Sequence, residues 1–365
     1  MLKKKLIDIV ILSASTTLLI VGLSWHYNHG EWKNYRRNRV EESVYRGFEA
    51  LALNDLHNAE TFFSSFFNET GNEVENFFKL NHRLQTRTRY VYGDMLFCRK
   101  NFQKAEVVWR PIFEDVVSML DFLVSGAPRK DILVSYVSTL KENKNVPEIL
   151  KFFNICYEKN GNASVILKKF KDDPLLRSIA GDFFFKRNEY KKVVDLLKPL
   201  FENPKMLSKL NDKHQALSKW HYGYSSIYEG NLAKDLLSSF FDNSMKETKL
   251  FEFLDQKDQV ACRVQYALML LEENDFEKST KLIESLFDKN GELLPTIRNI
   301  PFQDLIRNIY GYTLCKQGRY SEANKVWDWF FKAENKSLIK NFSKSEVNLL
   351  DSLRKNINRR DVDQL

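Results

Sequence analysis

Glycine and proline are scarce in this 365-residue chain, which holds 13 of the first and 8 of the second. A protein of many short strands and tight turns needs more of both, so their scarcity favours helices. The chain also has four cysteines, Cys98, Cys156, Cys262 and Cys315, with no CxxC pair and no histidine at zinc spacing. This pattern excludes a recognisable zinc site, and we expect free thiols that fill small apolar spaces rather than disulfides or redox centres.

The sequence patterns of common enzymes are missing as well. There is no G-x-x-x-x-G-K-S/T loop, G-x-G-x-x-G turn, H-E-x-x-H helix or G-x-S-x-G elbow. His57, His82, His214 and His221 are scattered, and none has a Ser or Cys and a carboxylate spaced as a triad requires. We therefore expect a protein that is not an enzyme and that holds no cofactor and no metal.

Strong basic charge is missing from most of the chain. The net charge is +8, and residues 1–39 alone carry seven basic side chains against two acidic ones. A protein that binds nucleic acid needs a concentrated basic face on its folded part, because phosphate contacts supply most of the affinity. The basic excess is better interpreted as the flank of a membrane segment, and we expect no nucleic-acid partner.

One long apolar run is present, at residues 6–25, LIDIVILSASTTLLIVGLSW, after a short basic tail at residues 1–5. The 17 residues from Ile9 to Trp25 hold no charge, which is enough helix to cross a hydrocarbon core of about 30 Å. Trp25 and Tyr27 stand where interfacial aromatic residues belong. The run predicts an uncleaved transmembrane anchor bound in the lipid bilayer. A cleaved signal peptide is the alternative, but no A-x-A site follows.

Residues 26–42 form a polar juxtamembrane connector. Its His26 and His29 could share a metal on one helix face, but no third ligand is near, so a solvated pair is the better interpretation. Basic residues are nearly balanced on the two sides of the apolar run. Because so short a basic tail commonly stays in the cytoplasm, we expect a single-pass inner-membrane protein whose large C-terminal part is periplasmic. The unpaired cysteines favour the opposite orientation.

Beyond the connector, one pattern recurs through residues 43–340. In YGYTLCKQGRYSEA, residues 310–323, a small residue on a first helix (Gly311) is followed by a turn glycine (Gly318) and by a small residue on a second helix (Ala323). The first small position recurs in steps of 42 to 46 residues. Its seven occupants are Gly47, Gly93, Val137, Gly181, Gly223, Ala267 and Gly311.

Three further positions of the repeat keep their character. The residue before the small position is tyrosine in five copies, the residue nine later is apolar in every copy, and the residue sixteen later is bulky in all but one. Paired helices approach closely where one offers glycine and the other a small residue. We therefore assign a helix-packing role to Gly47, Gly93, Gly181, Gly223, Gly311, Ala59, Ala105 and Ala323.

This unit resembles the tetratricopeptide repeat, although that repeat has 34 residues and this one about 44. The extra residues must lengthen the helices or the connections, and Asn68 to Gly71, Asn203-Pro204 and Asp288 to Gly291 have turn chemistry. The resemblance implies an all-α fold: an α-solenoid of about seven helix pairs at 43–340, preceded by one transmembrane helix. Residues 341–365 then form a capping helix and tail.

In tetratricopeptide proteins the first helices line a concave groove, and that resemblance implies a binding surface made largely of aromatic and aliphatic side chains. An apolar groove favours a helix or an extended hydrophobic segment as ligand, whereas packing between neighbouring repeats is the alternative role for these residues. The candidate partner-binding residues are Phe48, Leu51, Asp94, Phe97, Asp182, Phe185, Trp220, Tyr224, Ile227, Leu268, Leu271, Asn308 and Tyr312.

Together these features predict a membrane-anchored scaffold for protein–protein interactions in a bacterial envelope complex, with self-association as a possible mode. Its architecture and composition are similar to the collar-type scaffolds of spirochaete periplasmic flagellar motors. An organelle-surface import receptor and a secretion or envelope-biogenesis adaptor are the alternatives. A cell-wall-acting enzyme built on a helical solenoid is the weakest candidate.

Overall fold

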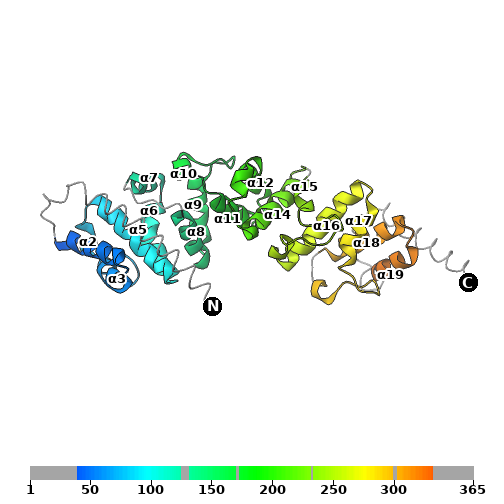
Figure 1. Ribbon diagram of the computed structural model, residues 1–365, viewed down its shortest axis with the longest axis horizontal. Helices are drawn as coiled ribbons and strands as arrows, with labels where there is room; N and C mark the ends of the chain where they lie inside the picture. The colour runs from blue at the N-terminus through cyan, green and yellow to red at the C-terminus, as the bar shows by residue number, and fades with distance from the viewer. Residues whose placement is uncertain (1–38, 125–130, 170–171, 232, 299–301, 332–365) are drawn as a thin grey trace, which may run out of the picture. The chain divides into compact units, whose positions relative to one another are not determined.

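The computed structural model describes residues 39–331, apart from 125–130, 170–171, 232 and 299–301. The described residues form helices α2 to α19 and two 3-10 helices, with no strand among them (Figure 1). The expected all-α class is therefore confirmed. The predicted anchor at 6–25 and the predicted cap at 341–365 lie outside the described residues. Within the part of the chain that is described, no helix is both long and apolar enough to cross a membrane.

The chain divides into two compact units, Met1–Leu176 and Arg177–Leu365. The division falls near the start of α11 (Pro174–Phe185). The helices of the first unit are α2 (Arg39–Ala52), α3 (Leu56–Ser64), α4 (Glu75–Phe78), α5 (His82–Cys98), α6 (Phe102–Phe113), α7 (Val116–Val124), α8 (Ile132–Glu142), α9 (Val146–Cys156) and α10 (Val165–Lys169). Those after α11 are α12 (Tyr190–Glu202), α13 (Pro204–Leu207), α14 (Asp212–Tyr228), α15 (Lys234–Ser238), η2 (Phe251–Phe253), α16 (Gln256–Glu272), α17 (Phe276–Glu284), η3 (Pro295–Ile297), α18 (Gln303–Lys316) and α19 (Tyr320–Phe331).

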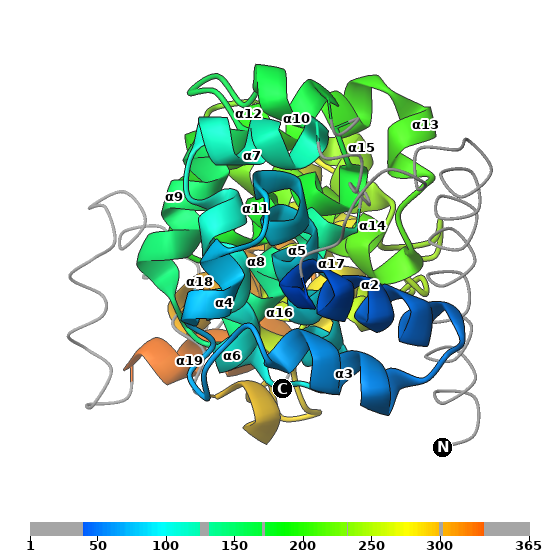
Figure 2. The same ribbon diagram turned by 90° about the vertical axis from the view of Figure 1, so that its left-hand side faces the viewer.

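The helix-pair pattern appears in both units. Each of the seven small positions lies on a first helix, and six second helices begin nine residues later, at the predicted apolar residue. Figure 1 and Figure 2 both show α2 and α3 lying side by side as one such pair. The exception is α15, which begins at Lys234. A second difference is that α2 includes residues 39–42, which the sequence analysis placed in the connector.

Every pair turns at the same place. The residue seven after the small position has a left-handed backbone in all seven copies, with φ between 56° and 78°. At Gly318 the first helix ends with hydrogen bonds from Gly318 N to the Cys315 carbonyl and from Arg319 N to the Leu314 carbonyl. This conformation satisfies the last carbonyls and reverses the chain. The seven residues are Asn54, Lys100, Lys144, Asn188, Gly230, Asn274 and Gly318.

The glycines of the first helices face the bulky residue sixteen positions later. A Cβ at Gly93 would lie 2.2 Å from Trp109 Nε1, and one at Gly311 would lie 2.2 Å from Trp327 Nε1. The close approach is therefore between glycine and a large ring or leucine, rather than only between two small residues as expected. In the fifth copy the late start of α15 places Leu237 opposite Gly223, and a Cβ there would lie 3.3 Å away.

The connections between pairs contain the extra residues of the unit. Four of them form a tight turn closed by an isolated antiparallel bridge, the one after α3 joining Phe67 to Glu73. The turn before η3 shows the local cause, because Asp288 Oδ1 accepts from the backbone of Asn290 and Glu292, and Gly291 has φ +77°. The predicted turn chemistry at Asn68 to Gly71, Asn203-Pro204 and Asp288 to Gly291 lies in these connections.

Stacked aromatic rings join successive pairs within each unit. The tyrosine before the small position lies against a phenylalanine at the end of the preceding second helix or in the turn after it. Ring centroids are 4.5 to 5.6 Å apart with interplanar angles of 11° to 30°. The stacked pairs are Phe67 with Tyr92, Phe113 with Tyr136, Phe201 with Tyr222, Phe241 with Tyr266, and Phe287 with Tyr310.

Buried or half-buried arginines reinforce three of these junctions. Each lies four residues before the small position and pairs with a glutamate at the end of the preceding turn. Arg307, for example, is 2% exposed, lies 2.8 Å from Glu292, and has its guanidinium carbon 4.7 Å from the centroid of Trp329. The three pairs are Arg89 with Glu73, Arg263 with Glu247, and Arg307 with Glu292.

Candidate functional site

The candidate partner-binding residues of the first unit are divided between its interior and its surface. Phe48 and Leu51 are buried, at 5% and 8% exposure, and Phe48 meets Phe63 edge-on at 5.3 Å. Asp94 and Phe97 are half-buried, and Phe97 lies 5.9 Å from Trp109. Phe48 and Leu51 therefore pack inside the unit, whereas Asp94 and Phe97 keep part of their surface exposed.

In the second unit, one candidate residue is fully buried and the others are half-buried. Trp220 has no exposed surface, and it brings two other candidates together, lying 6.3 Å from Phe185 and 5.0 Å from Tyr224. Tyr312 lies apart from them, against Phe276 at 6.4 Å. The half-buried candidates are Asp182, Phe185, Tyr224, Ile227, Leu268, Leu271, Asn308 and Tyr312.

Five aromatic rings form a continuous cluster in this unit, which we call the aromatic cluster. Its members are Phe185, Tyr190, Trp220, Tyr224 and Tyr228, from α11, α12 and α14, with neighbouring ring centroids 4.4 to 6.3 Å apart. The sequence analysis missed Tyr190 and Tyr228. The sequence feature that could have identified them is their position: each tyrosine lies two residues from the turn residue of its own repeat, at Asn188 and Gly230.

The exposure of the rings increases across the aromatic cluster, from the core to the surface. Trp220 is fully buried, Phe185, Tyr190 and Tyr224 are half-buried, and Tyr228 is 61% exposed. Burial raises the pKa of Tyr224 and of Tyr190, and in both cases the nearby Tyr228 hydroxyl adds to the shift. These phenols therefore stay neutral, and the Tyr190 hydroxyl donates to Asn188 Oδ1 at 2.9 Å.

Titratable groups border the cluster. His221 stacks on Phe185 at 4.2 Å, and burial lowers its pKa to about 4, opposed by Asp182 and Asp255. Asp258 is the unexpected group, because burial and the neighbouring Asp255 raise the pKa of its carboxyl to about 6. The sequence gives no signal for Asp258 beyond its place in the first turn of α16.

A serine and a histidine meet in the second unit, in the arrangement that a catalytic site would need. Ser178 Oγ lies 3.2 Å from His214 Nδ1, and Ser218 donates to Ser178 at 2.9 Å. Ser178 is only 2% exposed and Ser218 only 1%, so a substrate cannot reach the hydroxyl. The group links α11 and α14 and is better understood as helix packing.

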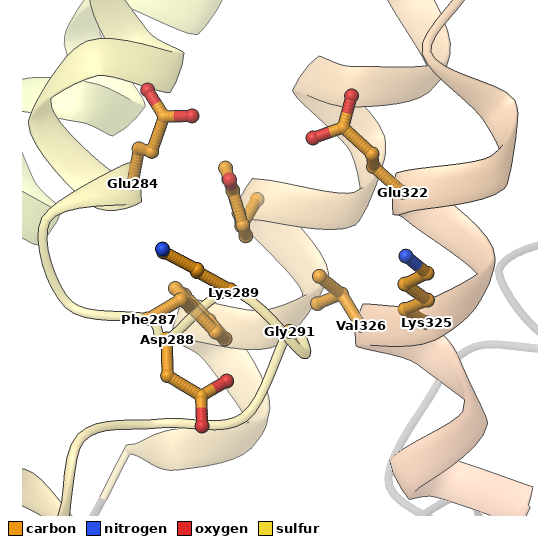
Figure 3. Close-up of a pocket in the computed structure, with 9 residues that line it drawn as sticks. Glu284, Phe287, Asp288, Lys289, Gly291, Glu322, Lys325 and Val326 are labelled. Atoms are coloured by element: carbon orange, nitrogen blue, oxygen red, sulfur yellow. The ribbon is translucent and has the colours of Figure 1, made fainter.

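A hollow of about 430 Å³ lies where α17 and its following turn meet α18 and α19. Figure 3 shows Glu284 and Glu322 at its rim together with Lys289 and Lys325. Arg319 pairs with both glutamates, at 3.3 Å and 2.7 Å. The charges of the hollow are therefore largely balanced, and it favours neither an anion nor a cation as ligand.

The remaining side chains give little support for other chemistry. Cys156, Cys262 and Cys315 are buried, whereas Cys98 is exposed, and burial raises the pKa of the Cys315 thiol to about 11. No group of three metal-binding side chains occurs among the described residues. In comparisons with known proteins, no family model, no curated protein and no solved structure matches this chain.

Proposed function

We propose that this protein is a membrane-anchored, tetratricopeptide-like α-solenoid that holds other proteins of a bacterial envelope complex together. The observation that carries the proposal is the recurrence of one helix pair seven times, each with a left-handed turn residue at the same position. A repeated pair of this kind buries its apolar face only against its neighbours, and it presents an extended surface rather than one enclosed site.

The contacts within each unit support this architecture. First helices contact the next first helix, as α2 contacts α5 and α16 contacts α18, and second helices contact the next first helix, as α6 contacts α8. The half-buried aromatic and aliphatic candidates supply the chemistry for binding polypeptide, because such side chains are favoured at protein interfaces. A scaffold therefore accounts for the features of the first helices without a catalytic role.

The proposed location rests on the sequence. The apolar run at 6–25 supplies the anchor, and its short basic tail favours a periplasmic solenoid. A collar-type assembly around a periplasmic flagellar motor is one specific form of this proposal, and a secretion or envelope-biogenesis adaptor is another. An import receptor requires the solenoid to face a cytosol instead.

Affinity capture tests the scaffold. The full chain, tagged at its C-terminus and cross-linked in the membranes of its own host, is expected to recover envelope proteins in stoichiometric amounts. Gly93→Leu, which forces a side chain into Trp109, is expected to lose those proteins while staying in the membrane fraction. Recovery of no protein, together with turnover of a cell-wall polymer by the purified chain, would instead establish the enzyme alternative.

A further inference from the structure

Lys219 stands where three other copies of the repeat have a paired arginine. It lies on α14, four residues before the small position of the fifth copy. In the equivalent place Arg263 pairs with Glu247 of the preceding connection, and two further copies have the same kind of pair. Lys219 is half-buried, and no ion pair from the described residues reaches it. Burial lowers the pKa of its ammonium group, as expected for a cation that lacks a counter-ion.

Lys219 faces the connection that precedes α14. Gln215 Nε2 donates to the Leu210 carbonyl at 2.8 Å, which holds one face of α14 against the end of that connection. Lys219 is one helical turn beyond Gln215, so it lies on the same face. The next pair has the same arrangement, because Gln259 bonds to its own connection and Arg263 lies one turn beyond. The lysine and the arginine therefore occupy equivalent places, and the difference lies in the connection.

The connection before α14 is shorter than its equivalents. From the stacked phenylalanine to the carbonyl that the glutamine contacts, it spans residues 201–210, whereas the equivalents span 67–80 and 241–254. It is therefore four residues shorter and, with all of its residues described, it lacks the bridged turn in which Glu73 and Glu247 lie. A short helix, α13, takes the place of that turn. The carboxylate is missing because the turn that carries it elsewhere is missing.

The same connection carries exposed lysines. Lys205 lies in α13, Lys209 follows α13, and Lys213 lies in the first turn of α14. None of the three takes part in an ion pair with another described residue. The one acid between them, Asp212, is engaged by Lys249 at 2.7 Å. These three residues and Lys219, which we call the lysine surface, therefore carry positive charge without compensation.

We propose that the lysine surface binds an acidic segment of a partner protein, and that one carboxylate of this segment takes the place of the missing glutamate beside Lys219. The inference rests on the proposed scaffold function and names the chemistry of one of its partners. The repeat itself indicates the ligand group, because a carboxylate neutralises the equivalent cation at three other junctions. A half-buried charge is costly until it is paired, so the pair formed on binding favours the complex. The exposed lysines attract further acidic side chains, and this attraction weakens as the salt concentration rises.

Peptide binding to the purified full chain in a non-ionic detergent tests the inference. The probes are three labelled six-residue peptides, of glutamate, glutamine and lysine, and the readout is fluorescence anisotropy at about 50 mM and about 300 mM salt. The glutamate peptide is expected to bind most tightly, and to bind several-fold more weakly at the higher salt concentration. Binding of all three peptides alike, or of none, would overturn the proposal.

Phosphate groups are the competing anions, because a nucleic acid and an anionic membrane also present negative charge. A six-nucleotide oligothymidylate, and phosphatidylglycerol mixed into the detergent micelles, are therefore tested as competitors of the glutamate peptide. The peptide is expected to stay bound when either competitor supplies an equal concentration of charge. Displacement of the peptide by either one would assign the lysine surface to phosphate and contradict the proposal.

Matched variants locate the site. Lys219→Gln is expected to weaken binding of the glutamate peptide about tenfold, whereas Lys219→Arg is expected to preserve it, because arginine keeps the charge. Lys191→Gln is the control, since Lys191 is an exposed lysine at the opposite end of α12 from α13 and its loss changes the net charge equally. Melting temperatures check that each variant is folded. Equal weakening by Lys219→Gln and Lys191→Gln would show non-specific charge attraction and overturn the inference.

A double variant separates this inference from the scaffold itself. If affinity capture recovers envelope proteins equally well with wild type and with a Lys209→Gln, Lys219→Gln double variant, and the glutamate peptide does not bind, the scaffold stands and the lysine surface is wrong. If the double variant selectively loses one captured protein and that protein's acidic segment binds the purified wild-type chain, the inference is supported.

Discussion

Gly93 and Gly223 occupy the same position of two repeats, but their neighbours differ. A Cβ at Gly93 would lie 2.2 Å from the indole of Trp109, which is itself fixed by its hydrogen bond to the Tyr90 carbonyl at 3.1 Å. A Cβ at Gly223 would lie 3.3 Å from a leucine methyl group that can yield. One added methyl group therefore has opposite consequences at the two sites.

Gly93→Ala is expected to lower the free energy of unfolding by about 2 kcal/mol, because the indole must shift in a close-packed pair. Gly223→Ala is expected to be neutral or to stabilise by up to about 1 kcal/mol, because alanine favours the helix. Urea denaturation of the purified variants measures both. Equal destabilisation by the two substitutions would contradict the pairing of first and second helices described here.

Two titratable residues, the buried His221 and the half-buried Asp258, make opposite contributions to acid stability. The pKa of His221 is about 4 in the folded chain and 6.5 in the reference state, so the unfolded chain binds more protons between these values. Stability from this group is present above pH 6.5 and is lost as the pH falls toward 4. For Asp258 the pKa rises from 3.8 to about 6, so the folded chain binds more protons and gains stability as the pH falls through the same range.

Accordingly, His221→Phe, which keeps a ring against Phe185, is expected to lose less stability than wild type on acidification from pH 7 to pH 4.5. Asp258→Asn is expected to lose more over the same range, because the compensating protonation is gone. Urea denaturation at four pH values within the range measures the two slopes. Slopes that match wild type in both variants would show that neither group is buried as described.

The turn between paired helices depends on one residue with a left-handed backbone. Lysine occupies this position in two copies, at Lys100 and Lys144, with φ of 61° and 56°. A residue with a Cβ is disfavoured there by about 1–2 kcal/mol, whereas glycine adopts the conformation freely. Lys144→Gly is therefore expected to stabilise the chain by about 0.5–1 kcal/mol.

Lys141→Gly is the matched control, because Lys141 lies in the last turn of α8, three residues earlier. There glycine is expected to destabilise by up to about 1 kcal/mol, since it favours the unfolded chain. Thermal denaturation of both variants checks the opposite signs. A stabilising Lys141→Gly or a destabilising Lys144→Gly would be inconsistent with the turn geometry.

The positions of the helices could be predicted from the sequence because turn and packing residues recur locally. The small position, the first residue of the second helix and the bulky residue sixteen later all follow from helical spacing and size. Which bulky residue lies opposite each glycine could not be predicted, because that depends on where the second helix begins. Trp109 of α6 lies opposite Gly93, whereas the late start of α15 places Leu237 opposite Gly223.

The junctions were harder to predict. The tyrosine before the small position recurs in five copies, so its position could be predicted. The phenylalanines on which these tyrosines stack lie in the preceding repeat, and a single sequence does not show which rings are in contact. An arginine stands four residues before the small position in only four copies, at Arg89, Arg177, Arg263 and Arg307. Asp258 is unrecognisable for a physical reason, since its raised pKa results from burial by neighbours that only the fold assembles.

The proposed orientation of the chain across a membrane concerns the whole molecule. The basic tail at 1–5 and the basic residues after the apolar run are nearly balanced, so the prediction depends on the shortness of the tail. A reporter active only in the periplasm, fused to the C-terminus, is expected to be active. A cytoplasm-only reporter at the same position is the control, and activity of that reporter alone would reverse the assigned topology.

Contacts between neighbouring pairs also predict how far a local destabilisation extends along the chain. In a repeat array each pair contacts only its neighbours, so opening one pair should loosen a local stretch, whereas one shared core would loosen everywhere. A Cβ at Gly47 would lie 2.8 Å from the Phe63 ring, so Gly47→Leu is expected to open the pair α2 and α3. Hydrogen exchange should rise in residues 39–64, to a lesser degree in α5, and remain unchanged in α16 to α19.

Gly311→Leu, whose new side chain would clash with Trp327, is the reciprocal variant and is expected to affect α18 and α19 but not α2 and α3. A uniform rise across both units in either variant would replace the array with a single cooperative core.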